Sequence, residues 1–544
     1  WPRPQTGSTA CKKTEYFIIM KINNAFKLFL ILTLIALYPA GIAAQVTPEW
    51  LQTFGNADST GDSGADVALD KDRNIYVVGT AGDKMIVMKY SPTGTLIWEK
   101  REFNVSGYSV RLDTSGNVYA LGWDGFGNLT LAKYTNSGTR LWFTNYSGSG
   151  SFRVNSIALD NSGNAYVAFS MNGVSVVKFA SWGTFQWRRS FSGIGSFTGR
   201  ILYNRSIKTD RLGNVYITGT ANTGGANNDH NIVTIKYNSS GDSLWTRVFD
   251  YENAGYDRGY VIDIDDSLNV YTAGITYQSS TYYSVLIKYS PSGNLIWHKL
   301  AEGGYDGATN LLWKNNYVYL LGGFEVPGTG FSPVVKFNTG GSIVWTAYYN
   351  EPVSQKYNAW FLNVDNEDNV YTGGVLFPQP DFAAIKYSSN GVKKWSLLYS
   401  GPNNSYDEPH GMTLDGNNLI FSGQTSMTSL NTDMILIKYR SDPIGIISQT
   451  SVIPSQFTLS QNYPNPFNPT TIITFGIPNH SGGSNTMLEV YDISGRLVKK
   501  LVNESLASGT YNVEFNAGEL SSGIYFYRLT SGARVFTKKM ILVK

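Results

Sequence analysis

The 544-residue sequence contains little cysteine, histidine or charge. Its single cysteine, Cys11, excludes a disulfide framework and a zinc site built on cysteine ligands. Its four histidines, His230, His298, His410 and His480, form no His-x-x-x-His or His-Glu pair, so a metal site or a Ser-His-Asp triad would need residues that lie far apart in the sequence. The 43 Lys and Arg against 40 Asp and Glu give a net charge of +3, which provides no general attraction for nucleic acid or a membrane surface.

Long hydrophobic runs are also missing. The apolar stretch Phe26–Leu37 is shorter than the roughly 20 residues that cross a bilayer as a helix, so a transmembrane anchor is the less favoured alternative. Because Lys21 and Lys27 precede the apolar run Leu28–Leu37 and small residues follow it, residues 20–44 are predicted to be a secretory signal peptide, cleaved near Ala44. No cysteine follows, which excludes a bacterial lipoprotein. We expect residues 1–19 to be over-extended translation upstream of the true start at Met20.

Glycine and aromatic residues, in contrast, are abundant. The chain has 56 Gly, 14% aromatic residues and 42% hydrophobic residues against only 15% charged ones. This hydrophobic content is sufficient for a buried core and excludes disorder. Residues that favour strands and turns dominate, so the composition predicts an all-β protein.

A motif recurs through the middle of the chain. Its first part, Asp-x-x-x-Asn-x-Tyr-x-x-Gly, begins at Asp70, Asp113, Asp160, Asp210, Asp265 and Asp365, with degenerate copies near Trp313 and Asp415. Its second part, Lys-aromatic-x-x-x-Gly-x-x-x-Trp, supplies Lys89, Lys133, Lys178, Lys236, Lys288, Lys336, Lys386 and Lys438. The tryptophans of the repeat are Trp50, Trp98, Trp142, Trp187, Trp245, Trp297, Trp345 and Trp395.

The length and content of each repeat are typical of a propeller blade, which has four strands. Each repeat contains four short apolar runs separated by turn residues, and eight copies predict an eight-bladed β-propeller over residues 46–440. A seven-bladed ring with one irregular unit is the alternative. The first copy starts with an isolated tryptophan strand, Glu49–Phe54, and the last, at Lys438, has no tryptophan after it. We therefore expect the N-terminal strand to complete the last blade, which hides two strand edges.

The repeats resemble a bacterial family of propeller repeats called SBBP repeats, whose pattern is matched by Val67–Gly79 and Ile207–Gly219. This resemblance covers residues 46–440 and implies a fold but no single activity. The Gly-x-x-x-Trp element also resembles the tryptophan docking motif of pyrroloquinoline-quinone dehydrogenases and of outer-membrane assembly lipoprotein propellers. That resemblance implies that the eight tryptophans dock each blade on the next. Quinoprotein chemistry is contradicted, because those enzymes usually carry an adjacent cysteine pair, and we expect no cofactor.

Residues 456–544 form a different module, reached through a linker over residues 441–455. About seven short strands in about 90 residues, with an Ile-Ser-Gly-Arg turn at 493–496, predict a small β-sandwich of immunoglobulin type.

This module resembles the type A C-terminal sorting domain of the type IX secretion system of Bacteroidetes. The segments that match are Gln461–Pro469, Val490–Gly495, Ser522–Arg528 and Lys538–Lys544. The resemblance implies that the secretion machinery carries the protein through the outer membrane of a Gram-negative cell, after which cleavage in the linker leaves it released or attached at the surface. The predicted sorting-motif residues are Asn465, Pro466, Phe467, Asn468, Pro469, Gly495, Gly523, Tyr525, Tyr527, Lys538, Lys539 and Met540.

Two recurring residues could carry chemistry. The Asp invites a calcium interpretation at Asp263–Asp266 and Asp365–Asn369, but the spacing lacks the six or more oxygens of an EF-type loop, so we interpret it as a turn cap. The Lys could form a basic ring in a channel, but we favour a strand-end lysine on a solvated face. We predict no metal ligand and no catalytic residue.

The favoured function is therefore a secreted or cell-surface propeller that binds a glycan, a protein or another envelope component. The wide loops 221–231 and 277–283, rich in Gly, Asn, Ser and Tyr, are the candidate contact sites. The alternative is a secreted hydrolase or lyase that acts on polysaccharide at the mouth of the channel. A cluster of carboxylates or a histidine in a concave pocket would favour that alternative.

Overall fold

The computed structural model describes two compact units, one spanning Val46–Pro443 and the other containing Ile444–Lys544. The described residues are 48–55, 61–124, 126–147, 153–170, 174–191, 205–222, 230–251, 256–278, 281–302, 307–323, 332–349, 356–378, 380–401, 406–428, 431–440, 446–450, 454–478, 485–506, 508–518, 520–532 and 534–544. The predicted signal peptide, residues 1–19 and much of the linker lie outside them.

Four-stranded antiparallel sheets make up the first unit, and eight of them are formed by its described residues. In order of hydrogen-bonded neighbours, the first four are β2 (Asp62–Leu69), β3 (Ile75–Ala81), β4 (Lys84–Tyr90), β5 (Leu96–Phe103); β6 (Ser106–Leu112), β7 (Val118–Trp123), β8 (Asn128–Tyr134), β9 (Arg140–Ser147); β10 (Arg153–Leu159), β11 (Ala165–Ser170), β12 (Val174–Phe179), β13 (Phe185–Phe191); and β14 (Ile207–Thr209), β15 (Val215–Asn222), β16 (His230–Tyr237), β17 (Ser243–Phe249). The other four are β18 (Arg258–Ile264), β19 (Val270–Gln278), β20 (Thr281–Tyr289), β21 (Leu295–Glu302); β22 (Ala308–Lys314), β23 (Tyr317–Gly322), β24 (Val334–Asn338), β25 (Ile343–Ala347); β26 (Lys356–Val364), β27 (Val370–Phe377), β28 (Asp381–Tyr387), β29 (Lys393–Tyr399); and β30 (Asp407–Asp415), β31 (Asn418–Thr428), β32 (Asn431–Tyr439), β1 (Pro48–Phe54).

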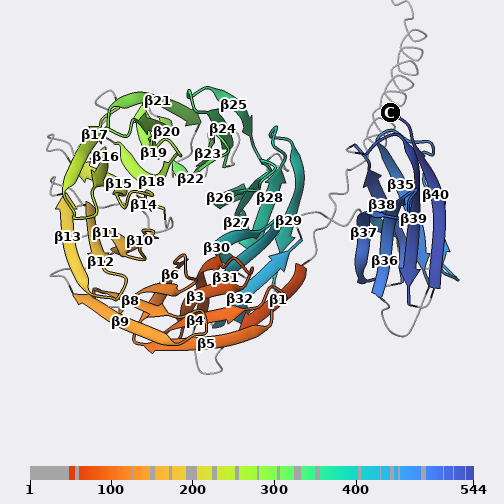
Figure 1. Ribbon diagram of the computed structural model, residues 1–544, viewed down its shortest axis with the longest axis horizontal. Coiled ribbons are helices and arrows are strands. Elements are labelled where there is room, and N and C mark those ends of the chain that lie inside the picture. The colour runs from red at the N-terminus through yellow and green to blue at the C-terminus, as the bar shows by residue number, and fades with distance from the viewer. Residues whose placement is uncertain are drawn as a thin grey trace, which may run out of the picture. The chain divides into compact units, whose positions relative to one another are not determined.

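The sheets stand around a ring, with their first strands toward the centre and their tryptophan strands outside (Figure 1). This is the arrangement of a β-propeller, and the described residues include no helix, so the all-β prediction is confirmed. Middle strands such as β4 are buried along almost their whole length, because neighbouring sheets cover both faces. Core clusters accordingly join adjacent sheets: Val78 of β3 packs in one cluster with Val118 of β7.

The two ends of the ring meet in one sheet. Strand β1 pairs with β32, placing Trp50 opposite Lys438 and Phe54 opposite Met434. The N-terminal strand thus completes a sheet whose other three strands come from residues 407–439, as the phase of the repeat predicts.

The recurring Asp caps a turn between the first and second strands of a sheet. Asp70 Oδ1 accepts a hydrogen bond from Asn74 N at 2.8 Å, and Oδ2 accepts one from Tyr76 Oη at 3.0 Å. The residue before the Asn adopts a left-handed conformation, with φ +64° at Arg73 and +78° at Gly116. These carboxylate oxygens are therefore bonded to their own turn, in agreement with the turn-cap interpretation.

The recurring lysines are buried, so the expectation of a solvated face is wrong. Each of the eight is at most 9% exposed. Lys133 Nζ lies 3.1 Å from Asp113 Oδ2, 4.6 Å from the centre of the Tyr119 ring and 3.2 Å from the carbonyl oxygen of Ser181 in the next sheet. Because a neighbouring sheet supplies the carbonyl and the motif supplies the carboxylate, the ammonium keeps its charge paired inside the protein.

Tryptophans link neighbouring sheets at the outer strands. The indole Nε1 of Trp98 donates a hydrogen bond to the carbonyl oxygen of Asn136 at 3.0 Å, and its ring packs on Gly138. Gly138 has φ +86°, and a Cβ atom there would lie 2.9 Å from Trp98 Cδ2, so this close approach requires glycine. The same bond to the next sheet is made by Trp50 to Pro92, Trp142 to Ser181, Trp187 to Ser239, Trp245 to Pro291, Trp297 to Thr339 and Trp345 to Ser389.

Two further four-stranded sheets form the second unit. They are β33 (Ile446–Thr450), β38 (Gly509–Asn516), β35 (Thr470–Ile477), β34 (Thr458–Leu459), and β37 (Leu497–Ser505), β36 (Asn485–Asp492), β39 (Gly523–Ser531), β40 (Arg534–Leu542). Both sheets contribute to one core, in which Phe475 of β35 joins Leu488 of β36 and Tyr527 of β39.

Candidate functional site

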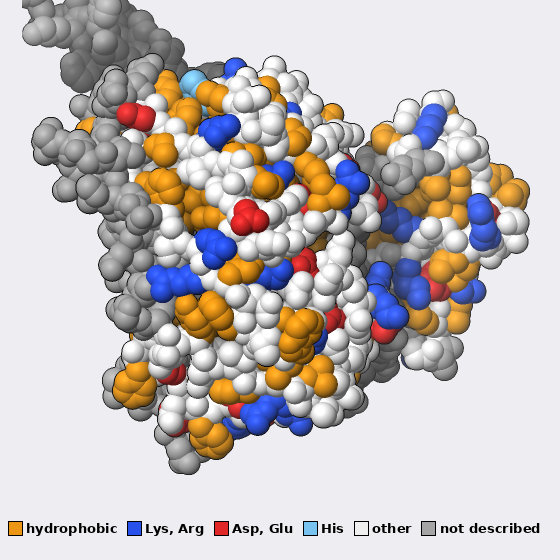
Figure 2. All heavy atoms as spheres, turned by 60° about the vertical axis from the view of Figure 1, so that its left-hand side comes forward, with side chains coloured by type: hydrophobic (Ala, Val, Ile, Leu, Met, Phe, Trp, Pro, Cys, Tyr) orange, Lys and Arg blue, Asp and Glu red, His pale blue; other side chains and the backbone are white. Residues whose placement is uncertain are grey.

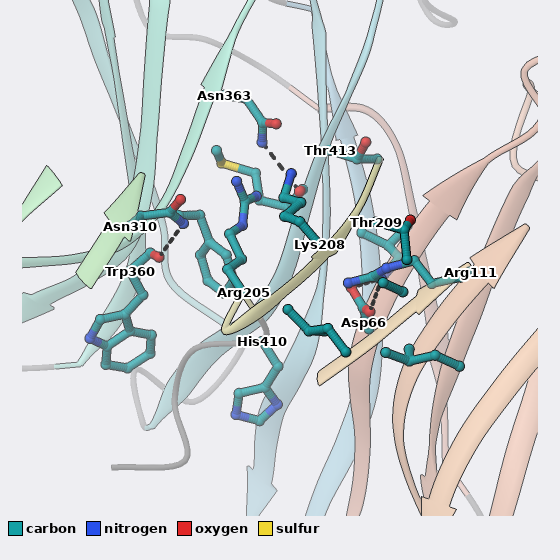
Figure 3. Close-up of a pocket in the computed structure, with 16 residues that line it drawn as sticks. Asp66, Arg111, Arg205, Lys208, Thr209, Asn310, Trp360, Asn363, His410 and Thr413 are labelled. Atoms are coloured by element: carbon teal, nitrogen blue, oxygen red, sulfur yellow. Dashed lines mark hydrogen bonds and ion pairs between the residues drawn. The ribbon is translucent and has the colours of Figure 1, made fainter. Parts of the chain in front are cut away.

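A cavity of about 360 Å³ lies at the centre of the ring (Figure 3). Side chains from β2, β6, β10, β14, β22, β26 and β30 line it, together with Arg205, which precedes β14. These are first strands of seven different sheets, so the cavity exists only because the ring closes.

Asp66 is the carboxylate of this lining, and it is fully engaged. Its Oδ2 accepts hydrogen bonds from Ser109 Oγ at 2.6 Å and from Val110 N at 3.1 Å, and it pairs with Arg111 Nη1 at 2.7 Å. A carboxylate oxygen that accepts from three donors is held in one place, and it positions Arg111 at the cavity wall.

The other cations of the cavity differ in their pairing. Lys208 Nζ lies 2.9 Å from Asp263 Oδ1, whose second oxygen accepts a hydrogen bond from Trp313 N at 2.8 Å. Arg205 makes no hydrogen bond or ion pair through its guanidinium with any residue that the structure describes. Burial lowers the pKa of Arg205 and the charge of Arg111 lowers it further, against the opposite effect of Asp263 and Asp66.

Two amides and an indole add polar groups to the cavity wall. Asn310 Nδ2 donates to the carbonyl oxygen of Trp360 at 3.1 Å, while its Oδ1 is buried and has no hydrogen-bond partner among the described residues. The same is true of the indole Nε1 of Trp360 within the described part of the chain. Asn363 Nδ2 donates to the carbonyl oxygen of Met412 at 3.3 Å. Both unpartnered atoms are closed to solvent, so neither is offered to a ligand in the cavity.

His410 connects the cavity to a serine and a glutamate. Its Nδ1 lies 2.9 Å from Ser63 Oγ and 3.1 Å from the carbonyl oxygen of Gly64, and its Nε2 lies 3.5 Å from Glu408 Oε2. Tyr406 Oη donates a 2.7 Å hydrogen bond to Glu408 Oε2. Burial raises the pKa of Glu408, but the hydrogen bonds from His410 and Tyr406 outweigh it and leave the pKa below its usual value.

The remaining histidines lie elsewhere. His298 packs against the rings of Phe249 and Tyr251, with ring centres 5.2 and 5.6 Å away. The ring of His230 lies 6.5 Å from that of Tyr256, and His480 is outside the described residues. Residues 223–229 and 279–280 of the two candidate contact loops are outside them as well.

The described residues contain no group of three or more His, Cys, Asp or Glu side chains placed to hold a metal ion. They also contain no helix that is long and apolar enough to span a membrane. On the face drawn in Figure 2, basic, acidic and apolar side chains are interspersed.

Two of the predicted sorting-motif residues, Asn465 and Phe467, bond to the last residues of the chain. Asn465 Oδ1 accepts a hydrogen bond from Ile541 N at 2.9 Å. Phe467 N donates to the carbonyl oxygen of Ile541, and Val543 N donates to that of Phe467, both at 3.0 Å. The Asn- and Pro-rich segment therefore pairs with the terminal strand 75 residues later, as the bridge between Phe467 and Leu542 shows.

Other motif residues are divided between core and surface. Tyr527 and Met540 are buried, and Tyr527 Oη donates a 2.8 Å hydrogen bond to the carbonyl oxygen of Ser460. Tyr525 Oη donates a 2.8 Å hydrogen bond to the carbonyl oxygen of Ser521, four residues earlier in the chain. Gly495 has φ +81° in a turn, and Gly523 begins β39. The motif residues exposed to solvent are Asn465, Pro466, Asn468, Pro469, Gly495, Gly523 and Lys539, and Lys538 is half-buried.

The second unit matches a known protein family. Residues 461–544 match the family described as secretion system C-terminal sorting domain. The chain carries a sorting domain. This sorting domain implies handling by the type IX secretion system and a secreted or cell-surface location in bacteria of the Bacteroidetes type.

No curated protein matches the chain. Among solved structures, the chain is similar to the Dos1 propeller, at 10% identity over 72% of this chain and 96% of that one, with a TM-score of 0.46. It is also similar to the polysaccharide lyase Uly1, at 9% identity over 72% and 92% of the two chains with a TM-score of 0.38. A protein of unknown function from Bacteroides caccae aligns at 15% identity over 50% and 93%, with a TM-score of 0.31.

Proposed function

We propose that the protein is a non-catalytic, eight-bladed propeller of the SBBP-repeat type that binds a ligand outside the cell. The observation that carries this proposal is the state of Asp66: the carboxylate lining the central cavity is committed to Ser109, Val110 and Arg111. Cleavage of a glycosidic bond by the usual route needs two carboxylates, one as acid and one as base or nucleophile. A cavity whose polar groups are mainly cations and amides is suited to holding a ligand.

A polysaccharide array tests this proposal. The purified protein, probed against neutral and acidic glycans, should be retained on some of them without releasing product. Product release that is lost in Asp66→Asn would overturn the proposal. The matched control is Asp72→Asn, because Asp72 is an exposed carboxylate in the same sheet.

The parts around the cavity have structural roles in this proposal. The eight tryptophans dock each sheet on the next, which the hydrogen bonds of seven of them to neighbouring carbonyls support. The sorting domain is an immunoglobulin-like sandwich that is removed once the propeller has crossed the outer membrane. A fluorescent protein placed between the predicted signal peptide and residues 454–544 should then leave a type IX-competent cell, and its retention in the periplasm would contradict this route.

A hydrolase is the second candidate, and the contacts of His410 favour it specifically. If His410 Nε2 carries its proton toward Glu408, then Nδ1 is free to accept the proton of Ser63 Oγ. This arrangement would support acyl transfer, such as ester hydrolysis, rather than glycosidic cleavage. The carbonyl oxygen of Gly64 opposes it, because at 3.1 Å it favours a proton on Nδ1 instead.

A further inference from the structure

The central cavity contains one more positive charge than its acidic groups balance. Arg111 is paired with Asp66 at 2.7 Å and Lys208 with Asp263 at 2.9 Å. In the part of the chain that the structure describes, Arg205 has neither a hydrogen bond nor an ion pair to its guanidinium. A charge that is partly removed from water without a partner is costly, so this position favours an anion from outside the protein.

We infer that the cavity binds a small ligand with one carboxylate group, which pairs with Arg205. A guanidinium presents its N–H groups in a planar fork that matches the two oxygens of a carboxylate. The excess of one charge suits a monoanion better than a phosphate dianion. This inference rests on the proposed binding function and names the chemistry of its ligand.

The surroundings of Arg205 are consistent with a missing anion. Burial is the largest cause of its lowered pKa, and the nearby charge of Arg111 acts in the same direction. Asp66 and Asp263 oppose this shift, but each is already bonded to another cation. A carboxylate bound to Arg205 would offset the repulsion that Arg205 experiences from Arg111.

The rest of the wall suits hydroxyl groups. The hydroxyl groups of Thr209 and Thr413 and the amide of Asn363 line the cavity, and all three residues are half-buried. Each can bond to a ligand hydroxyl, which both donates and accepts. The volume of about 360 Å³ lies within the roughly 300–1,000 Å³ of small-molecule sites. A carboxylate combined with several hydroxyl groups is the chemistry of a sugar acid.

Titration calorimetry on the protein with its sorting domain tests this assignment. The probes are galacturonate, galactose as the uncharged ligand with a similar ring, and tetragalacturonate. Galacturonate should bind at least about tenfold more tightly than galactose, because the charged hydrogen bond is lost with galactose. Arg205→Gln should weaken galacturonate binding by a similar factor and leave galactose unchanged, and Arg205→Lys should keep part of the affinity. Arg211→Gln is the matched control, because Arg211 is exposed in the same sheet.

The probes also separate two sources of the carboxylate. Binding of tetragalacturonate with the same dependence on Arg205 would identify the acidic end of a polysaccharide, and binding of galacturonate alone would identify a free sugar acid. Equal binding of galactose and galacturonate by the unaltered protein would overturn the inference, as would no binding of either acid. Retention on the glycan array that survives Arg205→Gln would overturn it while leaving the binding function in place.

Discussion

The indole Nε1 of Trp50 donates a hydrogen bond to the carbonyl oxygen of Pro92 at 3.2 Å, although strand β1, which carries Trp50, is paired with β32 at the other end of the ring. Lys438 of β32 reaches the same carbonyl oxygen at 3.1 Å. Trp50 of β1 and Lys438 of β32 therefore both bond the last sheet to the first. These contacts matter for the stability of the ring because every other neighbouring pair of sheets is also connected by the chain itself.

We expect Trp50→Ala to destabilise the propeller by about 2–4 kcal/mol, from the loss of packing on Gly94 and of the hydrogen bond to Pro92. Deletion of residues 46–55 should have a larger effect. Tryptophan fluorescence during urea unfolding measures this unit, since every tryptophan except Trp1 lies between residues 50 and 395. Trp182→Ala is the control, because Trp182 is 67% exposed. Unchanged unfolding after the deletion would contradict closure by β1.

The turn carboxylates predict a loss of stability in acid. Burial raises the pKa of Asp210, but hydrogen bonds from Asn214 and Tyr216 lower it below its usual value. A carboxyl group with a lower pKa in the folded state stabilises the protein fully above its unfolded pKa of about 3.9, and this stabilisation is lost as the pH falls from there through the lower pKa of the folded state. Asp210→Asn should therefore cost about 1–3 kcal/mol at pH 7 and less at pH 3.

Urea unfolding at the two pH values, followed by tryptophan fluorescence, measures this difference. Asp72→Asn provides the control because Asp72 is exposed. If Asp210→Asn were equally destabilising at pH 3 and pH 7, the carboxylate charge would not be what stabilises the turn.

The repeat made much of the fold predictable from sequence. Its Asp and Asn positions identify a turn by local hydrogen bonds alone, and its spacing identifies the four-stranded sheet. The buried state of Lys133 could not be read in the same way, because its partners include the carbonyl oxygen of Ser181, which only the packing of two sheets brings near.

The cavity was still harder to predict. Asp66, Arg205 and His410 lie outside the repeated motif, on or next to first strands of three different sheets, and closure of the ring brings them to one cavity. His410 and Ser63 are 347 residues apart. The sequence around His410 carries no signal that would identify its partners.

Within the sorting domain, Asn465 is expected to matter more than Asn468, although both belong to the same Asn-Pro motif. Asn465 accepts the hydrogen bond of Ile541 N, whereas Asn468 is exposed and makes no side-chain hydrogen bond to a described residue. Asn465→Ala should destabilise the domain by about 1 kcal/mol and speed hydrogen exchange at the Ile541 amide. Asn468→Ala should do neither. Equal exchange in the two variants would show that the terminal strand does not depend on this contact.

Substitution of Ser63, the serine that contacts His410, distinguishes the two candidate functions. If the protein only binds, hydrolysis of p-nitrophenyl acetate should not exceed that of buffer, and Ser63→Ala should leave glycan retention unchanged. The physical reason is that the Gly64 carbonyl oxygen, 3.1 Å from Nδ1, favours a proton on that nitrogen and so prevents it from taking the proton of Ser63. Hydrolysis that fell at least about a hundredfold in both Ser63→Ala and His410→Gln, but not in Ser292→Ala on an exposed turn, would instead establish acyl transfer. Ser63 would then be the nucleophile and Glu408 the residue that orients His410, and the binding-only proposal would be wrong.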